Sequence, residues 1–112
     1  MNKLFAIDGS TLYSINPENG AYTELTGSWN DSKKLVIHKN TIYVLDGSTI
    51  YKVNPDDGSY TELCGGWNNT HLLTSSGDSL FAIDNSTLYK INPASGEYTE
   101  LSSSWNNTKC LG

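Results

Sequence analysis

The stretch IYVLDGSTIYKVNPDDGSYTELCGGWNNT at residues 42–70 decides the fold, because the chain contains it three times in closely similar form. The other copies are LFAIDGSTLYSINPENGAYTELTGSWNDS at residues 4–32 and LFAIDNSTLYKINPASGEYTELSSSWNNT at residues 80–108. Successive copies begin 38 residues apart, with no insertion or deletion between them. A fixed period of about this length is typical of a repeat architecture. The regularity indicates recent duplication or deliberate design.

Each copy divides into short segments of β-forming residues separated by turn residues. In the first copy, strands are predicted at residues 4–8, 11–16 and 21–25, and a loop carrying Trp29 leads to another strand at 33–38. Asp8-Gly9 predicts a two-residue hairpin turn, and the Asn-Pro-x-x-Gly segment at 16–20 predicts a second turn. No helical period extends over a long window, so the sequence predicts an all-β fold.

The pattern within the strands distinguishes a β-propeller from a sandwich. The segments Leu4-Phe5-Ala6-Ile7 and Ile42-Tyr43-Val44-Leu45 are apolar at consecutive positions, so both faces of these strands must be covered. Tyr22-Thr23-Glu24-Leu25 alternates instead, as expected for an outer strand near solvent. Residues 1–112 are therefore predicted to form one domain of three 38-residue blades, each a four-stranded antiparallel sheet.

The chain starts in phase with the second strand of a blade, and residues 107–112 are in phase with the start of a first strand. We therefore expect this C-terminal strand to close a blade begun at the N-terminus of a partner chain. Propeller rings contain about four to eight blades, so three blades do not close alone. The prediction is a six-bladed ring formed by a homodimer that exchanges strands at the termini, with nine blades as the alternative.

The order of motifs resembles the blades of tachylectin-type propeller lectins. The resemblance is carried by Gly65-Gly66-Trp67-Asn68, Leu72-Leu73, Gly77-Asp78-Ser79-Leu80-Phe81-Ala82 and Thr87-Leu88-Tyr89-Lys90, and it covers almost the whole chain. The repeat here is shorter than that of the family around the Asn-Pro-x-x-Gly segment, which is similar to turns in bacterial quinoprotein-like propeller repeats. The resemblance implies sugar sites between neighbouring blades, one for each repeat.

The tryptophan loops are the sequence's best binding candidates. Each places an indole beside side-chain amides, and sugars need both an aromatic surface for their C–H groups and planar polar groups for their hydroxyls. The predicted carbohydrate-binding residues are Trp29, Asn30, Trp67, Asn68, Trp105 and Asn106. The alternative is that the indole packs between neighbouring sheets while the asparagine stabilises the loop. Equal sites on a ring would gain affinity for a repeated glycan through avidity.

Composition and motifs argue against several other classes of function. The net charge of −5 and the lack of a basic cluster disfavour nucleic acid and anionic membranes as partners. His38 and His71 are out of phase with each other, and no nucleophile, phosphate-loop or metal-ligand motif is present, so we expect no enzyme activity, metal or cofactor. The N-terminal apolar run is too short for a signal peptide, which leaves the compartment open with the cytoplasm as the default.

Two alternatives to a lectin follow from the same residues. One is a propeller scaffold, natural or engineered, that has no ligand. The other is a protein-interaction platform of the WD-repeat kind. The hairpin turn explains the repeated aspartates Asp8, Asp46 and Asp84. Cys64 and Cys110 are too few for a disulfide scaffold and lie at different phases of the repeat, and free thiols are favoured over a disulfide between them.

Overall fold

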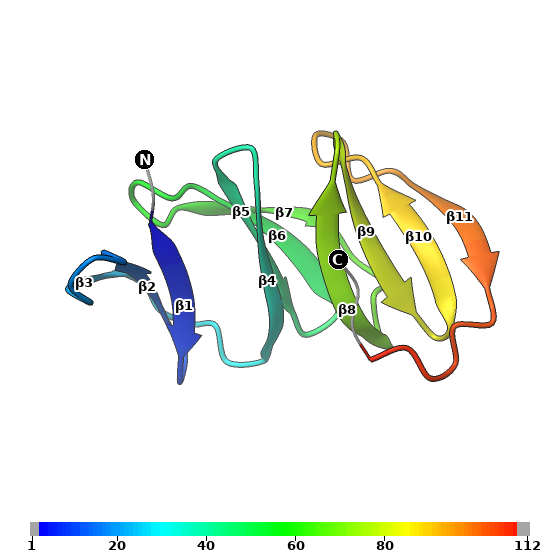
Figure 1. The fold of residues 1–112 in the computed structure, drawn as a ribbon, viewed down its shortest axis with the longest axis horizontal. Coiled ribbons are helices and arrows are strands. Elements are labelled where there is room, and N and C mark those ends of the chain that lie inside the picture. Colours follow the sequence, from blue (N-terminus) through cyan, green and yellow to red (C-terminus); the bar gives the residue numbers. More distant parts are fainter. Residues whose placement is uncertain (1–2, 110–112) are drawn as a thin grey trace.

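The computed structural model describes residues 3–109 and contains three antiparallel sheets that stand side by side (Figure 1). Within these residues all of the regular structure is β, which confirms the predicted all-β class. The strands are β1 (Leu4–Asp8), β2 (Thr11–Ile15), β3 (Tyr22–Thr26), β4 (Ser32–His38), β5 (Thr41–Asp46), β6 (Thr49–Val53), β7 (Tyr60–Cys64), β8 (Thr70–Ser76), β9 (Ser79–Asp84), β10 (Thr87–Ile91) and β11 (Tyr98–Ser103).

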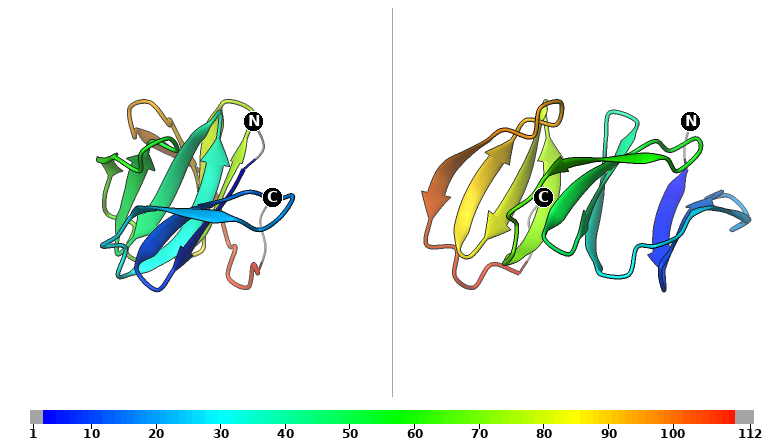
Figure 2. Two further views of the ribbon diagram at one scale, coloured as in Figure 1. Left: turned by 90° about the vertical axis from the view of Figure 1, so that its left-hand side faces the viewer. Right: turned by 180° about the vertical axis from the view of Figure 1, so that it is seen from behind.

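The second and third sheets each have four strands in the order β4-β5-β6-β7 and β8-β9-β10-β11. The first sheet has three, β1-β2-β3, so it lacks the strand that corresponds to β4 and β8. Seen from behind in Figure 2, the same row runs from the first sheet at one end to the third at the other. We call these sheets blades 1, 2 and 3. Blades 2 and 3 each take their first strand, β4 or β8, from the end of one repeat and their other three strands from the next repeat.

The hairpin between the first two strands of the repeat differs by one residue from the prediction. Asp8 pairs with Thr11, so the two loop residues are Gly9 and Ser10, and Asp8 is the last residue of β1. Gly9 adopts a φ of 65°, which glycine reaches without steric cost. The repeated aspartate is therefore not a loop residue. In blade 3, Asp84 accepts a hydrogen bond of 2.6 Å from the Thr70 hydroxyl and so joins β9 to the start of β8.

The hydrophobic core lies between the blades. One cluster of buried side chains fills the junction of blades 1 and 2, and another fills the junction of blades 2 and 3. Strand β5 is almost wholly buried because it has a neighbouring blade on each face. Its counterpart β1 is only half-buried, since blade 1 has a neighbour on one face alone. The consecutive apolar residues that predicted covered strands are thus explained by interblade packing.

The Asn-Pro-x-x-Gly turn joins the two outer strands of each blade, and in blades 2 and 3 it reaches over the preceding blade. In blade 3 the Asn92 carboxamide oxygen accepts a hydrogen bond from the Ala94 backbone amide, which holds the turn. Gly96 ends the turn with a φ of 80°. A Cβ atom at Gly96 would lie 2.5 Å from the Leu63 carbonyl oxygen on β7. Glycine is therefore required there for close contact between blades as well as for backbone conformation.

The predicted C-terminal strand at 107–112 lies partly outside the described residues. Residues 107–109 form turn and irregular structure that lies against β8, where the His71 imidazole Nε2 is 3.2 Å from the Thr108 carbonyl oxygen. The inner strands β4 and β8 also run next to each other. Residues 107–109 thus lie beside β8. Nowhere in residues 3–109 is there a helix long and apolar enough to cross a membrane.

Candidate functional site

The tryptophan loops follow the outer strand of each blade, and the first two lead to the inner strand of the next blade. The backbone amides of Trp29, Trp67 and Trp105 each donate a hydrogen bond of 2.9–3.0 Å to a serine carbonyl oxygen in the hairpin of their own blade. Each indole N–H donates to the residue three positions earlier, which is Thr26, Cys64 or Ser102. The three loops therefore have the same internal geometry, fixed by the same repeat positions.

The first two indole rings are buried between blades. Trp29 and Trp67 each have 3% of their surface exposed. Trp67 packs against Tyr89 and Tyr98 of blade 3, with ring centroids 5.3 and 5.2 Å away. These two tyrosines meet edge to face at 5.6 Å. The arrangement is an aromatic cluster that seals the junction, and it leaves the Trp67 ring no open face for a sugar.

The predicted carbohydrate-binding residues are thus divided between two environments. Asn30, Asn68 and Asn106 are exposed beside their loops, and Trp105 is 41% exposed. The structure does not bring these asparagines together with an open face of Trp29 or Trp67. For the two internal junctions the geometry agrees with the alternative in which the indole packs between sheets. Sugar binding at these loops stays a prediction.

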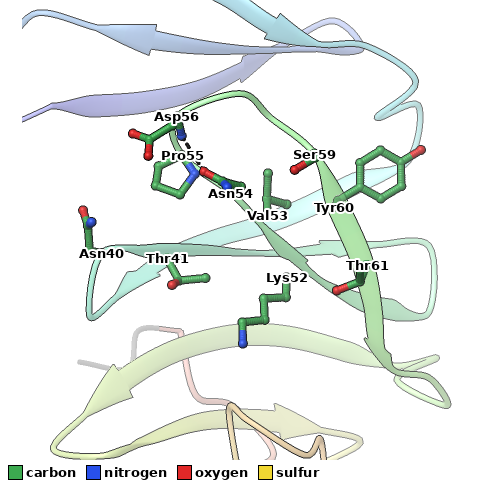
Figure 3. A pocket seen from close by; sticks show the side chains of 10 residues that line it. All are labelled: Asn40, Thr41, Lys52, Val53, Asn54, Pro55, Asp56, Ser59, Tyr60 and Thr61. Atoms are coloured by element: carbon green, nitrogen blue, oxygen red, sulfur yellow. Dashed lines mark hydrogen bonds between the residues drawn. The ribbon is translucent and has the colours of Figure 1, made fainter.

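A polar groove lies at the other end of the blade, beside the Asn-Pro-x-x-Gly turn of blade 2 (Figure 3). It is open to solvent and has a volume of about 460 Å³. Thr41 comes from β5, Lys52 from β6 and Thr61 from β7, while Asn54 and Asp56 belong to the turn. These residues carry hydroxyl, ammonium, amide and carboxylate groups, and in Figure 3 the Lys52 ammonium and the Asp56 carboxylate point to opposite sides of the groove.

The same groove recurs in blade 1 with a volume of about 670 Å³. Its turn residues Asn16, Pro17 and Glu18 hold the repeat positions of Asn54, Pro55 and Asp56 in blade 2. Tyr22 and Thr23 likewise correspond to Tyr60 and Thr61. We call this recurrent feature the Asn-Pro groove. In blade 3 the sequence keeps Asn92, Pro93, Tyr98 and Thr99 but has Ala94 at the acidic position.

The sequence patterns do not predict the Asn-Pro groove. They assign the Asn-Pro-x-x-Gly segment only to a turn. The signal that could have found the groove is the repeated polar set around that turn, including the acidic residue at position 18 or 56. That signal is ambiguous in sequence, because polar residues at a turn are ordinarily explained by solvent exposure.

Two ionisable groups with a shifted pKa lie near contacts between blades. Lys39 in the β4–β5 hairpin and Asp78 in the β8–β9 hairpin form an ion pair between blades, which lowers the pKa of Asp78. Partial burial raises the pKa of the Cys64 thiol. Neither group lies in the Asn-Pro groove. Within residues 3–109, no three His, Cys, Asp or Glu side chains gather as a potential metal site.

Comparison with known proteins identifies the fold. The chain is similar to the N-terminal domain of Nup159, with 12% identity and a TM-score of 0.68 over 90% of this chain and 31% of that one. It is also similar to the extracellular domain of the putative hybrid two-component system BT4673 from B. thetaiotaomicron, with 15% identity and a TM-score of 0.72 over 98% of this chain and 16% of that one. A chain in a complex of S. cerevisiae Dbp5 with Nup159, Gle1, IP6 and ADP matches at 12% identity and a TM-score of 0.67, over 88% of this chain and 30% of its own length.

These neighbours are β-propellers, so the three sheets are propeller blades, as the sequence predicts. The chain spans less than a third of the length of each neighbour. No family model and no curated protein matches the sequence, and the likeness to tachylectin-type lectins stays a resemblance. A propeller is a scaffold on which binding sites are placed, and function must be argued from those sites.

Proposed function

We propose that this protein is a multivalent carbohydrate-binding propeller module that uses the Asn-Pro grooves of blades 1 and 2. The observation that carries this function is the recurrence of the groove at the same repeat positions in blades 1 and 2. A ligand with repeated units can occupy equivalent sites at once, and linked sites gain about 10²–10⁴ in affinity when the geometry allows simultaneous binding. Glycans are ligands of this kind.

The lining of the groove suits a polyhydroxylated ligand. Lys52 donates hydrogen bonds, the Asp56 carboxylate accepts them, and the hydroxyls of Thr41 and Thr61 do both. The Asn54 carboxamide oxygen is occupied by the Asp56 backbone amide at 2.8 Å, which fixes the turn and leaves the amide N–H groups of Asn54 for a ligand. Because the groove is open and polar, its sites are expected to be individually weak.

An aromatic side chain stands at the rim of each groove. Tyr60 is 48% exposed, although one side of its ring contacts Trp29 at a centroid distance of 5.0 Å. In Figure 3 the Tyr60 ring points away from Asn40 at the opposite side of the groove. We therefore assign the main recognition to hydrogen bonds inside the groove and a secondary apolar contact to the exposed part of the tyrosine.

A glycan array with matched variants tests this function. Lys52→Ala combined with Asp56→Ala removes charged groups from the groove of blade 2, and neither side chain belongs to the interblade core. We expect binding to fall by about tenfold or more, because one site of a multivalent set is lost. The control replaces the exposed loop residues Asn30, Asn68 and Asn106 by Ala, which should leave binding unchanged.

The two variants separate the possible sites. Loss of binding in the loop variant, with the groove variant unaffected, would place the sites at the tryptophan loops and overturn the groove assignment. Absence of binding to any glycan on the array would overturn the carbohydrate-binding function itself and leave a scaffold or a protein-interaction platform. Circular dichroism of each variant shows whether the fold is retained.

A further inference from the structure

The two ends of the blade row carry complementary halves of a blade junction. The outward face of blade 1 has a hollow of about 290 Å³ lined by Ala6, Asp8, Tyr13, Ile15, Gly20 and Tyr22. At the same repeat positions, blade 3 has Ala82, Asp84, Tyr89, Ile91, Gly96 and Tyr98. Blade 3 uses this surface to receive Trp67, which packs on Tyr89 and Tyr98 and shares a buried cluster with Ala82 and Ile91.

The tyrosine pair on the outward face of blade 1 already has the geometry of the pair that contacts Trp67 in blade 3. Tyr13 and Tyr22 meet edge to face with ring centroids 5.5 Å apart and planes at 89°. Tyr89 and Tyr98 adopt the same arrangement around Trp67, at 5.6 Å and 86°. Among the described residues no indole packs on the tyrosine pair of blade 1, yet the pair is held in the receiving arrangement. Such a preorganised surface loses little conformational freedom on binding.

Trp105 of blade 3 is held by the same pattern of hydrogen bonds as the two buried tryptophans. The Trp105 amide donates to the Ser86 carbonyl oxygen at 3.0 Å, and its indole N–H donates to the Ser102 hydroxyl at 2.9 Å. The loop thus matches those of Trp29 and Trp67, but Trp105 is 41% exposed where they are 3% exposed. The difference arises because no blade follows blade 3 in the described chain.

Further pairs of repeat positions show the same mismatch in burial. A Cβ atom added to Gly20 on the blade 1 turn would meet nothing within 4 Å, whereas the corresponding Gly96 lies against Leu63 of the preceding blade. Leu101, which holds the repeat position of Leu63, is 48% exposed.

The aspartate that ends β1 and β9 follows this pattern too. Asp8 is exposed, whereas its counterpart Asp84 accepts a hydrogen bond from Thr70. Thr108 holds the repeat position of Thr70, and its carbonyl oxygen lies 3.2 Å from the His71 imidazole at β8. The group that would complete the contact at Asp8 is therefore carried at the opposite end of the chain.

We infer that a second copy of this chain closes the row into a six-bladed ring, with Trp105 of each copy inserted into the Tyr13–Tyr22 hollow of the other. Two copies give two identical new junctions related by a two-fold axis, a closed symmetry that is common in homodimers. The occupant is another copy because the two ends match each other position by position, as internal neighbours do. Six blades lie within the range of about four to eight found in propeller rings. This assembly does not depend on glycan binding.

Solution mass across a dilution series tests this assembly on the full chain. Native mass spectrometry and light scattering are expected to give twice the mass of one chain. A wild-type protein with the mass of a single chain throughout the series would overturn the assembly. A mass of three chains would overturn the two-chain ring in favour of a larger one.

Two variants test the specific contact from its two sides. Trp105→Ala removes the inserting ring, and Ala6→Leu fills the hollow that receives it. Both residues lie on faces that are open in the single chain, so each variant should keep the circular dichroism spectrum of a folded β protein. We expect each to raise the dissociation constant of the dimer by about 10³-fold, because a central aromatic contact is lost at two junctions. A dimer that persists unchanged in both variants would place the interface elsewhere and overturn the assignment.

Discussion

Replacing Gly96 by alanine should destabilise the single chain much more than the same change at Gly20. Both glycines end an Asn-Pro-x-x-Gly turn with nearly the same backbone, φ being 80° at Gly96 and 78° at Gly20. An alanine in this left-handed region costs about 1–2 kcal/mol at either position. The two positions differ only in what surrounds them, so the pair isolates the contact between blades.

The additional cost at Gly96 follows from the distances around it. A Cβ atom there would lie 2.5 Å from the Leu63 carbonyl oxygen and 3.2 Å from Cys64 Cβ, and the nearer atom belongs to the backbone of β7. The turn or the strand must therefore move. Overpacking of this kind costs about 1–3 kcal/mol. We expect Gly96→Ala to cost about 2–5 kcal/mol in total and Gly20→Ala about 1–2 kcal/mol.

Guanidinium unfolding measures this difference directly. Both changes are introduced into a chain that also carries Trp105→Ala, so that only single chains are compared. Circular dichroism and tryptophan fluorescence should give coincident transitions, which checks that a single free energy of unfolding is meaningful for a repeat protein. Equal costs for the two variants, within about 0.5 kcal/mol, would show that the turn of blade 3 does not press against β7 in solution.

Three further predictions concern polar groups at the blade edges. Asp84→Ala should cost about 1–2 kcal/mol because it removes the acceptor of the Thr70 hydroxyl, whereas Asp8→Ala in the single chain should stay within about 0.5 kcal/mol; both are measured by chemical unfolding. With the other cysteine replaced by serine, Cys64 should be alkylated more slowly than a free thiol at the same pH, because burial raises its pKa. The carboxyl pKa of Asp78, followed by NMR, should lie below its ordinary value of 3.8 and should rise in Lys39→Ala. Because the pKa of Asp78 is lowered in the folded state, the contribution of the ion pair to stability is fully present above the ordinary pKa and is lost as the pH falls through the folded-state pKa.

Local sequence features accounted for most of the backbone of each blade. The predicted strand at residues 4–8 has the bounds of β1, and those at 11–16, 21–25 and 33–38 differ from β2, β3 and β4 by one residue at one or both ends. These agreements arise because β propensity and turn residues act over a few positions. The hairpin was misplaced by one residue for a related reason: Asp-Gly and Gly-Ser pairs are both compatible with tight turns, and only the pairing of Asp8 with Thr11 distinguishes them.

The candidate sites were harder to predict because they depend on contacts between repeats. An indole beside an asparagine has the same sequence signature whether its ring faces solvent or a neighbouring blade. In the structure Trp29 and Trp67 are buried while Trp105 is half-exposed, although all three hold the same repeat position. The Asn-Pro groove brings together side chains from three strands and a turn, so no short motif describes it.

By itself, the amino-acid sequence determined the repeat, the strands and the number of blades in one chain. It also showed that the apolar strands at residues 4–7 and 42–45 must be covered on both faces. Those properties follow from period, propensity and apolar patterning, which are local or strictly repeated. The tertiary structure alone decided which of three equivalent positions is buried, which aspartate accepts a hydrogen bond and which turn glycine has a close neighbour. These differ between repeats because each depends on whether another blade stands beside it, and identical residues acquire different roles at the middle and at the ends of an open row.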